Sequence, residues 1–164
     1  MSAAVYAGSF DPVTFGHLNI IERVAPLFDS LTVLVANDPT KNYFFTPDER
    51  KQLIEKSIKK APNVRVDFWS GLTVDYVKKA KAKYLVRGIR SISDFDHEFV
   101  MSEMNKKLDP NIDTIFVPAD SEFHFISSRA VKEVALNGGD LGAFVPAAVA
   151  KAVREKIVQK RKTT

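Results

Sequence analysis

A single histidine, His17, stands where an apolar-periodic segment begins near the N-terminus. Before it, the apolar run Ala3–Ala7 leads into Gly8-Ser9-Phe10-Asp11-Pro12. This order predicts a strand, a glycine turn and the first turn of a helix, where unpaired backbone N–H groups and the helix dipole favour an anion. An imidazole at that position adds a hydrogen-bond donor, so the segment indicates a phosphate site; otherwise His17 merely caps the helix.

Cationic side chains follow two other predicted strands. Lys41 lies in Asp38-Pro39-Thr40-Lys41-Asn42, and Arg87 and Arg90 follow the apolar run that begins at Tyr84. Lysine acts on phosphate as a point charge, whereas a guanidinium grips pairs of oxygen atoms. These types favour a second set of phosphate contacts, unless the lysine is only a solvated loop residue and the arginines form ordinary ion pairs with Asp94 or Asp96.

A third polar segment, Phe123-His124-Phe125-Ile126-Ser127-Ser128-Arg129, precedes a predicted helix. Its two serines suit either ordinary helix caps or a second helix N-terminus that binds phosphate. The remaining histidine, His97, and His124 lack metal-ligand spacing with any partner, so we expect no protein metal site. The chain also lacks a P-loop, a dinucleotide-binding glycine motif and an arrangement of serine, histidine and aspartate.

The predicted elements alternate between strands and helices, which indicates a single α/β domain over residues 1–164. We expect a Rossmann-like, doubly wound sheet of five parallel strands with flanking helices and a C-terminal helix, all strands being buried on both faces. The predicted strands are Ala3–Gly8, Leu31–Asn37, Val64–Trp69, Tyr84–Arg87 and Ile112–Pro118. The predicted helices are His17–Phe28, Pro47–Lys60, Thr73–Lys81, Asp94–Leu108, Ser128–Leu136 and Pro146–Gln159, with a kink or early stop at Pro26. Ligands of such sheets bind at the carboxyl ends of the strands, where each polar segment falls.

The composition excludes several classes of protein. Of 164 residues, 45% are hydrophobic and 27% charged, and no apolar run approaches the roughly 20 residues of a membrane span. The absence of cysteine excludes disulfides and thiolate zinc sites; with no recognisable secretory signal, it favours a cytoplasmic location. The net charge of +4 fits an anionic ligand, and since the basic run Lys156–Lys162 has no interleaved aromatic residue, we expect no nucleic-acid partner.

The segment Thr14-Phe15-Gly16-His17 resembles the (T/H)xGH signature of the nucleotidyltransferase superfamily. Later segments narrow the resemblance to the bacterial phosphopantetheine adenylyltransferases. Together with Ser9-Phe10-Asp11-Pro12, they are Pro39-Thr40-Lys41, Arg87-Gly88-Ile89-Arg90, Asp94-Phe95 followed by Glu98, and Phe125-Ile126-Ser127-Ser128 followed by Val131-Lys132-Glu133. The resemblance runs from residue 3 to about residue 150 in the family's order and spacing.

The resemblance implies transfer of the adenylyl group of ATP to 4′-phosphopantetheine, giving dephospho-coenzyme A and pyrophosphate in coenzyme A biosynthesis. It assigns catalysis to His17, Lys41 and Arg90, and contacts with the pantetheine substrate to Ser9, Lys41, Thr73 and Arg87. The implied ATP contacts are Ser9, Phe10, His17, Gly88, Ile89, Arg90, Glu98, Phe123, His124, Phe125, Ile126, Ser127, Ser128 and Arg129. Glu98, as a carboxylate, fits a ribose or an arginine better than a phosphate, and Arg129 replaces a serine frequent in the family.

The implied reaction needs no general base, because the acceptor phosphate is already ionised near neutral pH. Catalysis then consists of in-line positioning and charge stabilisation, with Mg²⁺ bound mainly through ATP oxygens. The resemblance also implies a homohexamer and feedback inhibition by coenzyme A. Two other functions stay open: a related nucleotidyltransferase that uses nicotinamide mononucleotide or glycerol phosphate, and a non-enzymatic nucleotide- or RNA-binding module.

Overall fold

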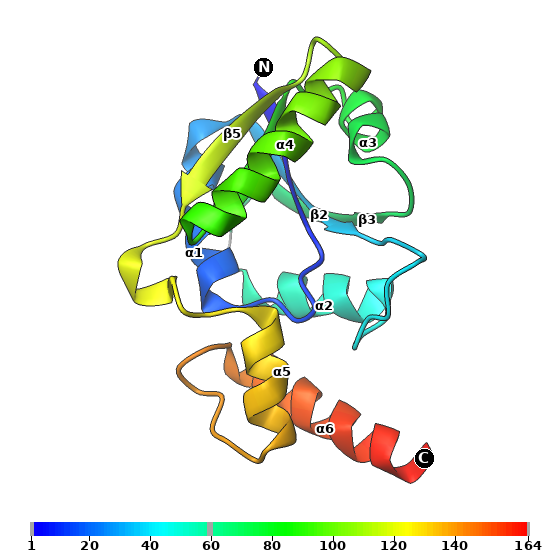
Figure 1. The fold of residues 1–164 in the computed structure, drawn as a ribbon, viewed down its shortest axis with the longest axis vertical. Helices are drawn as coiled ribbons and strands as arrows, with labels where there is room; N and C mark the ends of the chain where they lie inside the picture. The colour runs from blue at the N-terminus through cyan, green and yellow to red at the C-terminus, as the bar shows by residue number, and fades with distance from the viewer. Residues whose placement is uncertain (1, 59–60, 164) are drawn as a thin grey trace.

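The computed structural model describes residues 2–58 and 61–163. Within them the strands form one parallel five-stranded sheet in the order β3-β2-β1-β4-β5 (Figure 1). The strands are β1 (Ala3–Gly8), β2 (Ser30–Ala36), β3 (Val64–Trp69), β4 (Tyr84–Ile89) and β5 (Asp113–Pro118). The chain winds outward from β1 in one direction and from β4 in the other, so the two strands flank a topological switch point. The predicted doubly wound α/β class is confirmed.

Helices cover both faces of this sheet (Figure 1). One face carries α1 (Phe15–Val24), the 3₁₀ turn η1 (Ala25–Leu27) and α2 (Pro47–Ser57), and the other carries α3 (Thr73–Lys79) and α4 (Ile92–Leu108). The chain continues after β5 through η2 (Ser121–Phe123), α5 (Ser128–Leu136) and α6 (Ala147–Thr163). Helices α5 and α6 pack on each other and extend the core of the α2 face beyond the sheet.

The element ends differ from prediction by a few residues, for local reasons. Pro26 ends α1, because the chain tightens into η1 there, as expected. Thr46 and Glu49 form a capping box at the start of α2, in which each side chain bonds to the backbone N–H of the other residue. The predicted end of α2 at Lys60 lies outside the described residues, and the helix is described only to Ser57. β4 runs on to Ile89, two residues beyond prediction, because Gly88 and Ile89 still pair with β5.

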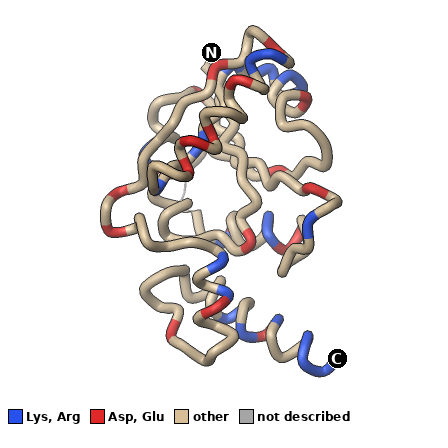
Figure 2. The backbone as a smooth tube through the Cα atoms, in the orientation of Figure 1, with Lys and Arg blue, Asp and Glu red and all other residues tan. Residues whose placement is uncertain are grey.

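The expectation that every strand is buried on both faces is wrong for the outer strands. β1 and β2 are buried along most of their length, whereas the residues of β3 and β5 are all partly buried or exposed. The strand order explains this, because β3 and β5 are the edges of the sheet. Among the described residues, no helix is long and apolar enough to cross a membrane. Lysine and arginine gather along α6 near the C-terminus (Figure 2).

Candidate active site

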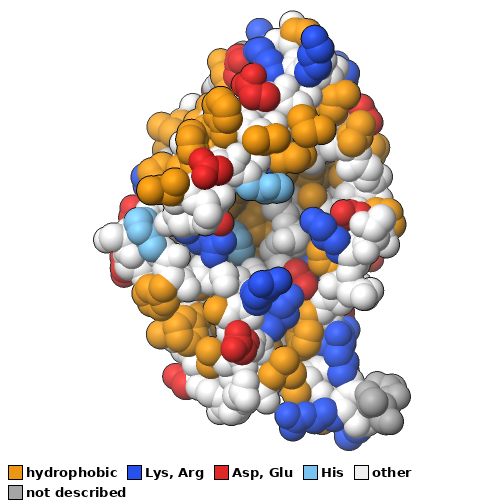
Figure 3. Space-filling model, in the orientation of Figure 1, with side chains coloured by type: hydrophobic (Ala, Val, Ile, Leu, Met, Phe, Trp, Pro, Cys, Tyr) orange, Lys and Arg blue, Asp and Glu red, His pale blue; other side chains and the backbone are white. Residues whose placement is uncertain are grey.

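A cavity of about 340 Å³ opens at the carboxyl edge of the sheet, beside the switch point of β1 and β4. Its walls come from the ends of these strands, the first turn of α1, the start of α4 and the start of α5. Figure 3 shows this face of the molecule hollowed, with lysine and arginine side chains near the rim. The volume lies at the lower end of small-molecule sites, which suits a ligand that extends beyond the cavity.

The turn after β1 is built around a buried phenylalanine. Phe10 adopts a positive φ of 46°, and its ring is 1% exposed, with ring centroids 5.3 Å from Tyr6 and 5.0 Å from His17. A Cβ on Gly8 would lie 3.0 Å from the Phe10 ring, so glycine allows the ring to fold back under the strand end. The backbone of the turn therefore lines the cavity while the aromatic ring fixes its shape.

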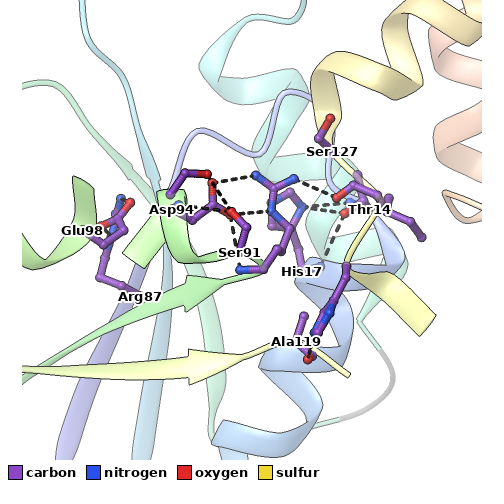
Figure 4. Close-up of polar contacts among 12 residues, drawn as sticks. Thr14, His17, Arg87, Ser91, Asp94, Glu98, Ala119 and Ser127 are labelled. Carbon is purple, nitrogen blue, oxygen red and sulfur yellow. Dashed lines mark hydrogen bonds and ion pairs between the residues drawn. The ribbon is translucent and has the colours of Figure 1, made fainter. Parts of the chain in front are cut away.

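His17 completes a capping box with Thr14 at the start of α1 (Figure 4). The backbone N–H of Thr14 donates to His17 Nδ1 at 3.0 Å, and the Thr14 hydroxyl lies 3.1 Å from the same nitrogen. Because Nδ1 accepts a hydrogen bond, the proton of the neutral imidazole resides on Nε2. The capping interpretation is therefore correct for one ring nitrogen, and the other remains available as a donor in a residue that lines the cavity.

The imidazole of His17 is uncharged at neutral pH. Burial lowers the pKa of His17 to about 4, and the positive charge of Arg90 lowers it further in the same direction. A neutral donor at this position avoids placing a cation against the positive end of the α1 dipole. His17 can thus supply a hydrogen bond, but not a charge, to an anion in the cavity.

The two arginines of the Arg87-Gly88-Ile89-Arg90 segment are held by two acidic residues of α4 (Figure 4). Arg87 makes a two-pronged contact with Glu98, at 2.5 and 2.6 Å, and donates to the carbonyl of Ala7 at 2.7 Å. Arg90 Nε lies 3.1 Å from Asp94. Glu98 therefore orients an arginine, one of the two roles considered for it from the sequence. Arg90 forms an ion pair with Asp94, one of the two partners that the sequence left open as an alternative to phosphate contacts.

Arg90 also connects β4 to the segment before α5. Its Nη1 donates to the carbonyl of Ile126 at 2.9 Å, and Ile126 is 2% exposed in the wall of the cavity. Gly88 is needed between the two arginines, because a Cβ there would overlap Ile20 of α1 and lie 3.1 Å from the Tyr6 hydroxyl. Successive side chains of a strand point to opposite faces of the sheet. Arg87 therefore points towards α4, whereas Gly88 faces α1 and leaves room there for Ile20.

The start of α5 faces the same cavity. Ser127 caps the helix by accepting from the N–H of Ala130 at 3.0 Å, and the Ser128 hydroxyl donates to the carbonyl of Pro12 at 2.7 Å. Both serines line the cavity, as does Arg129, whose side chain is exposed. Two helix N-termini, those of α1 and α5, therefore border one concave site, an arrangement that favours a chain of phosphates.

The cavity gathers most, but not all, of the predicted site residues. It is lined by Ser9, Phe10, His17, Arg87, Gly88, Arg90, Glu98, Ile126, Ser127, Ser128 and Arg129. Apart from Lys41, five predicted residues lie outside its lining. Thr73 begins α3, Ile89 ends β4 and Phe123 ends η2. His124 Nε2 is 2.9 Å from the carbonyl oxygen of Ala119, and Phe125 is 66% exposed with its ring beside that of Phe144. Their predicted ligand contacts remain predictions.

Lys41 also lies outside the cavity lining, in the long loop between β2 and α2. Its side chain is 68% exposed and its Nζ is 3.9 Å from Asp38. β2 is the strand next to β1, so the loop leaves the sheet at the same edge as the cavity. The predicted contact of Lys41 with the acceptor phosphate remains a prediction.

Sequence reasoning missed two buried charged residues that hold the site together. Asp11, 4% exposed, accepts from the backbone N–H groups of Phe44 and Phe45, and Arg50 is 0% exposed beneath the loop of Lys41. Asp11 belongs to a quoted motif, but its role as an anchor had no signal in the sequence. Arg50 stands in an ordinary charged helix segment, where burial of the side chain cannot be read from residue spacing.

Comparisons with known proteins place this architecture in a family. The family profile described as Cytidylyltransferase-like matches residues 5–134. A phosphopantetheine adenylyltransferase of Bdellovibrio bacteriovorus is 53% identical over 154 residues, which are 94% of this chain and 96% of the relative. One from Syntrophomonas wolfei is 50% identical over 158 residues, 96% of this chain and 98% of the relative. The chain belongs to the phosphopantetheine adenylyltransferase family.

This membership confirms the family resemblance carried by the motifs around His17, Lys41, Arg87 and Ser127. A solved structure with the same arrangement is the nicotinic acid mononucleotide adenylyltransferase of Plasmodium falciparum in complex with NaAD. It is 15% identical, with a TM-score of 0.68 over 97% of this chain and 95% of the other. At that identity the likeness shows the shared fold alone.

Proposed function

We propose that this protein transfers the adenylyl group of ATP to 4′-phosphopantetheine, releasing pyrophosphate and forming dephospho-coenzyme A. The observation that carries the proposal is the identity of about half the residues, over 94% of the chain, with a relative of that name. The cavity supports it chemically, because it combines two helix N-termini, a neutral imidazole donor and two oriented arginines. These are groups that stabilise a phosphoryl transition state by position and charge.

On the ATP side, His17, Arg90 and the start of α5 act together. His17 Nε2–H donates to a phosphate oxygen as negative charge develops on it, while Arg90 contributes the formal positive charge. Ser127, Ser128 and the backbone N–H groups of α5 hold the pyrophosphate that leaves. Arg129 adds a second cation at the mouth of the cavity.

On the acceptor side, Lys41 and Arg87 take the phosphate and the pantetheine arm. Glu98 holds the side chain of Arg87 in place, and Arg87 lines the cavity. A phosphate that binds Arg87 therefore does not have to order this side chain first. Lys41 is the mobile partner, and Thr73, at the start of α3, provides a further contact for the substrate arm. The acceptor phosphate attacks as a dianion, so no protein base takes part.

The residues fit a Mg²⁺ ion that ATP itself carries. Within the described part of the chain no group of three or more metal-binding side chains occurs, and the two carboxylates that line the cavity, Asp94 and Glu98, are engaged by arginines. When bound through the phosphate oxygens, Mg²⁺ supplies charge neutralisation for the leaving pyrophosphate.

A panel of acceptors tests the proposed function against its nearest rival. We expect pyrophosphate release from ATP with 4′-phosphopantetheine but not with nicotinamide mononucleotide or glycerol phosphate. Preference for either of the latter would contradict the proposal. A nucleic-acid-binding module would instead bind RNA with a steep salt dependence and release no pyrophosphate.

We also propose that the protein is a homohexamer and that α4 lies in an interface between copies. This 17-residue helix has no buried residue, although it carries Phe95, Phe99, Met101, Met104 and Leu108, and hydrophobic side chains gather over it in Figure 3. Such an exposed apolar surface is typical of an interface, and the described residues of the single chain leave it uncovered. Closed symmetric assembly supplies that cover.

Sedimentation velocity at micromolar concentration checks the assembly. We expect a hexamer for the wild type and smaller species for Phe99→Glu, because a charge at a covered apolar position opposes association. Val158→Glu on α6, where the side chain is 53% exposed, serves as the control and should keep the hexamer. A monomeric wild type would contradict the assembly.

Coenzyme A should compete with 4′-phosphopantetheine, because both present the same phosphate-linked pantetheine arm to the site. The extra 3′-phosphate meets positive charge from Arg87 and Arg90, which line the cavity. Inhibition kinetics at limiting 4′-phosphopantetheine measure the effect. A rate unchanged at saturating coenzyme A would show that the two ligands do not share this site.

A further inference from the structure

Arg50 of α2 is the largest side chain that is completely buried in the described structure. Its guanidinium donates to the carbonyl of Ser9 at 2.9 Å and to Oδ1 of Asn37 at 2.6 Å, and it lies 3.9 Å from the centre of the Tyr43 ring. Burial lowers the pKa of Arg50, while the negative charge of Asp11 opposes this shift. A buried guanidinium is costly, so it requires several well-placed partners.

These partners belong to the two loops that border the site. Ser9 lies in the turn between β1 and α1, whereas Asn37 and Tyr43 lie in the loop that carries Lys41. The Tyr43 hydroxyl accepts from the N–H of Asp38 at 3.0 Å, so its contact with Arg50 also fixes the first half of that loop. Arg50 thus joins the turn that shapes the cavity to the base of the Lys41 loop.

A second tether holds the other end of the same loop. Asp11 accepts from the N–H groups of Phe44 and Phe45 at 2.8 and 2.9 Å, and Lys132 of α5 pairs with it at 3.1 Å. The segment between the tethers contains Lys41, which projects into solvent. Both ends of the loop are therefore fixed to the turn that precedes α1, and Thr40 and Lys41 at its tip bond to Asp38 within the same loop.

From this geometry we propose that Arg50 is a positioning residue that acts through Lys41. It sets the place of the Lys41 loop relative to the cavity and thereby the capture of the acceptor phosphate, without touching either substrate. The inference rests on the proposed function, because it assigns Lys41 to the acceptor. It predicts that a defect at Arg50 falls on 4′-phosphopantetheine and not on ATP.

The test is a double-mutant cycle with steady-state kinetics. Arg50→Lys keeps the positive charge but loses the guanidinium group that contacts both Ser9 and Asn37. We expect kcat/KM for 4′-phosphopantetheine to fall about tenfold or more, because small misplacements of catalytic groups lower rates by up to about 10²-fold. KM for ATP should change by less than about twofold. In a Lys41→Ala background the same substitution should have almost no effect, because coupled residues are not additive.

Two further variants separate positioning from folding. Asn37→Ala removes the loop-side acceptor of Arg50 and should give the same selective defect, with or without a change in thermal unfolding temperature. Arg154→Lys, at an exposed pair with Asp140, is the matched control and should leave the kinetics unchanged. Additive effects in the cycle, or equal losses for both substrates, would overturn the inference. A wild type that releases no pyrophosphate with 4′-phosphopantetheine would instead overturn the proposed function.

Discussion

His17→Ala should lower turnover by about 10²–10³-fold, the usual cost of removing one donor that stabilises developing charge. It should weaken ATP binding far less, because the helix N-termini and Arg90 still hold the phosphates. Steady-state kinetics with pyrophosphate detection measure both quantities. The exposed His97 of α4 provides the control, and His97→Ala should keep normal turnover. Retention of more than half of the wild-type turnover by His17→Ala would contradict the assignment.

The pH dependence follows from the ionisation of the same residue. Burial and Arg90 depress the pKa of His17 to about 4, so the neutral donor persists at neutral pH and is lost only as pH falls towards that value. The pH–rate profile should therefore show no ionisation of His17 near 6.5, the ordinary range of histidine. NMR of the imidazole measures the pKa of His17 directly. A value near 6.5 would contradict the burial of His17 and its contact with the charge of Arg90.

Substitutions of the cationic residues should divide between the two substrates. Lys41→Ala and Arg87→Ala should raise KM for 4′-phosphopantetheine more than KM for ATP, and Arg90→Ala should do the reverse. Each loss should be about 10–100-fold, the range for a hydrogen bond to a charged group. Lys41→Ala should also lower turnover, since its charge acts in the transition state. Identical effects of all three variants on both substrates would contradict this division.

The Arg87 variant needs its own control. Glu98 is only 14% exposed and its carboxylate is held by Arg87, so Arg87→Ala leaves a partly buried negative charge beside the phosphates. Adding Glu98→Gln to Arg87→Ala removes that charge. If loss of the arginine is the cause, the double variant should keep the high KM for 4′-phosphopantetheine. Recovery of the wild-type KM would attribute the defect to Glu98 alone.

The sequence predicted those parts of the fold that depend on local patterns. Apolar runs located the strands, and Pro26 located the end of α1. It could not tell edge strands from central ones, because strand order is a property of the whole sheet. The exposure of β3 and β5 follows from that order and not from their own residues.

The candidate site was predictable in its residue types but not in its pairings. Glycine, histidine, arginine and serine at strand ends indicated phosphate, and the cavity gathers most of them. That Glu98 holds Arg87 while Asp94 holds Arg90 depends on the angle at which α4 crosses the sheet. The charge state of His17 likewise depends on its burial, and the role of Arg50 depends on two loops that meet only in three dimensions.

Pyrophosphate release is the most direct test of the account. ATP, Mg²⁺ and the purified protein are combined with and without 4′-phosphopantetheine, and the nucleotide product is identified by mass spectrometry. We predict rapid, acceptor-dependent release of pyrophosphate with one equivalent of dephospho-coenzyme A. In His17→Ala the same reaction should be about 10²–10³-fold slower. Release of pyrophosphate without the acceptor, or none in its presence, would contradict the central claim.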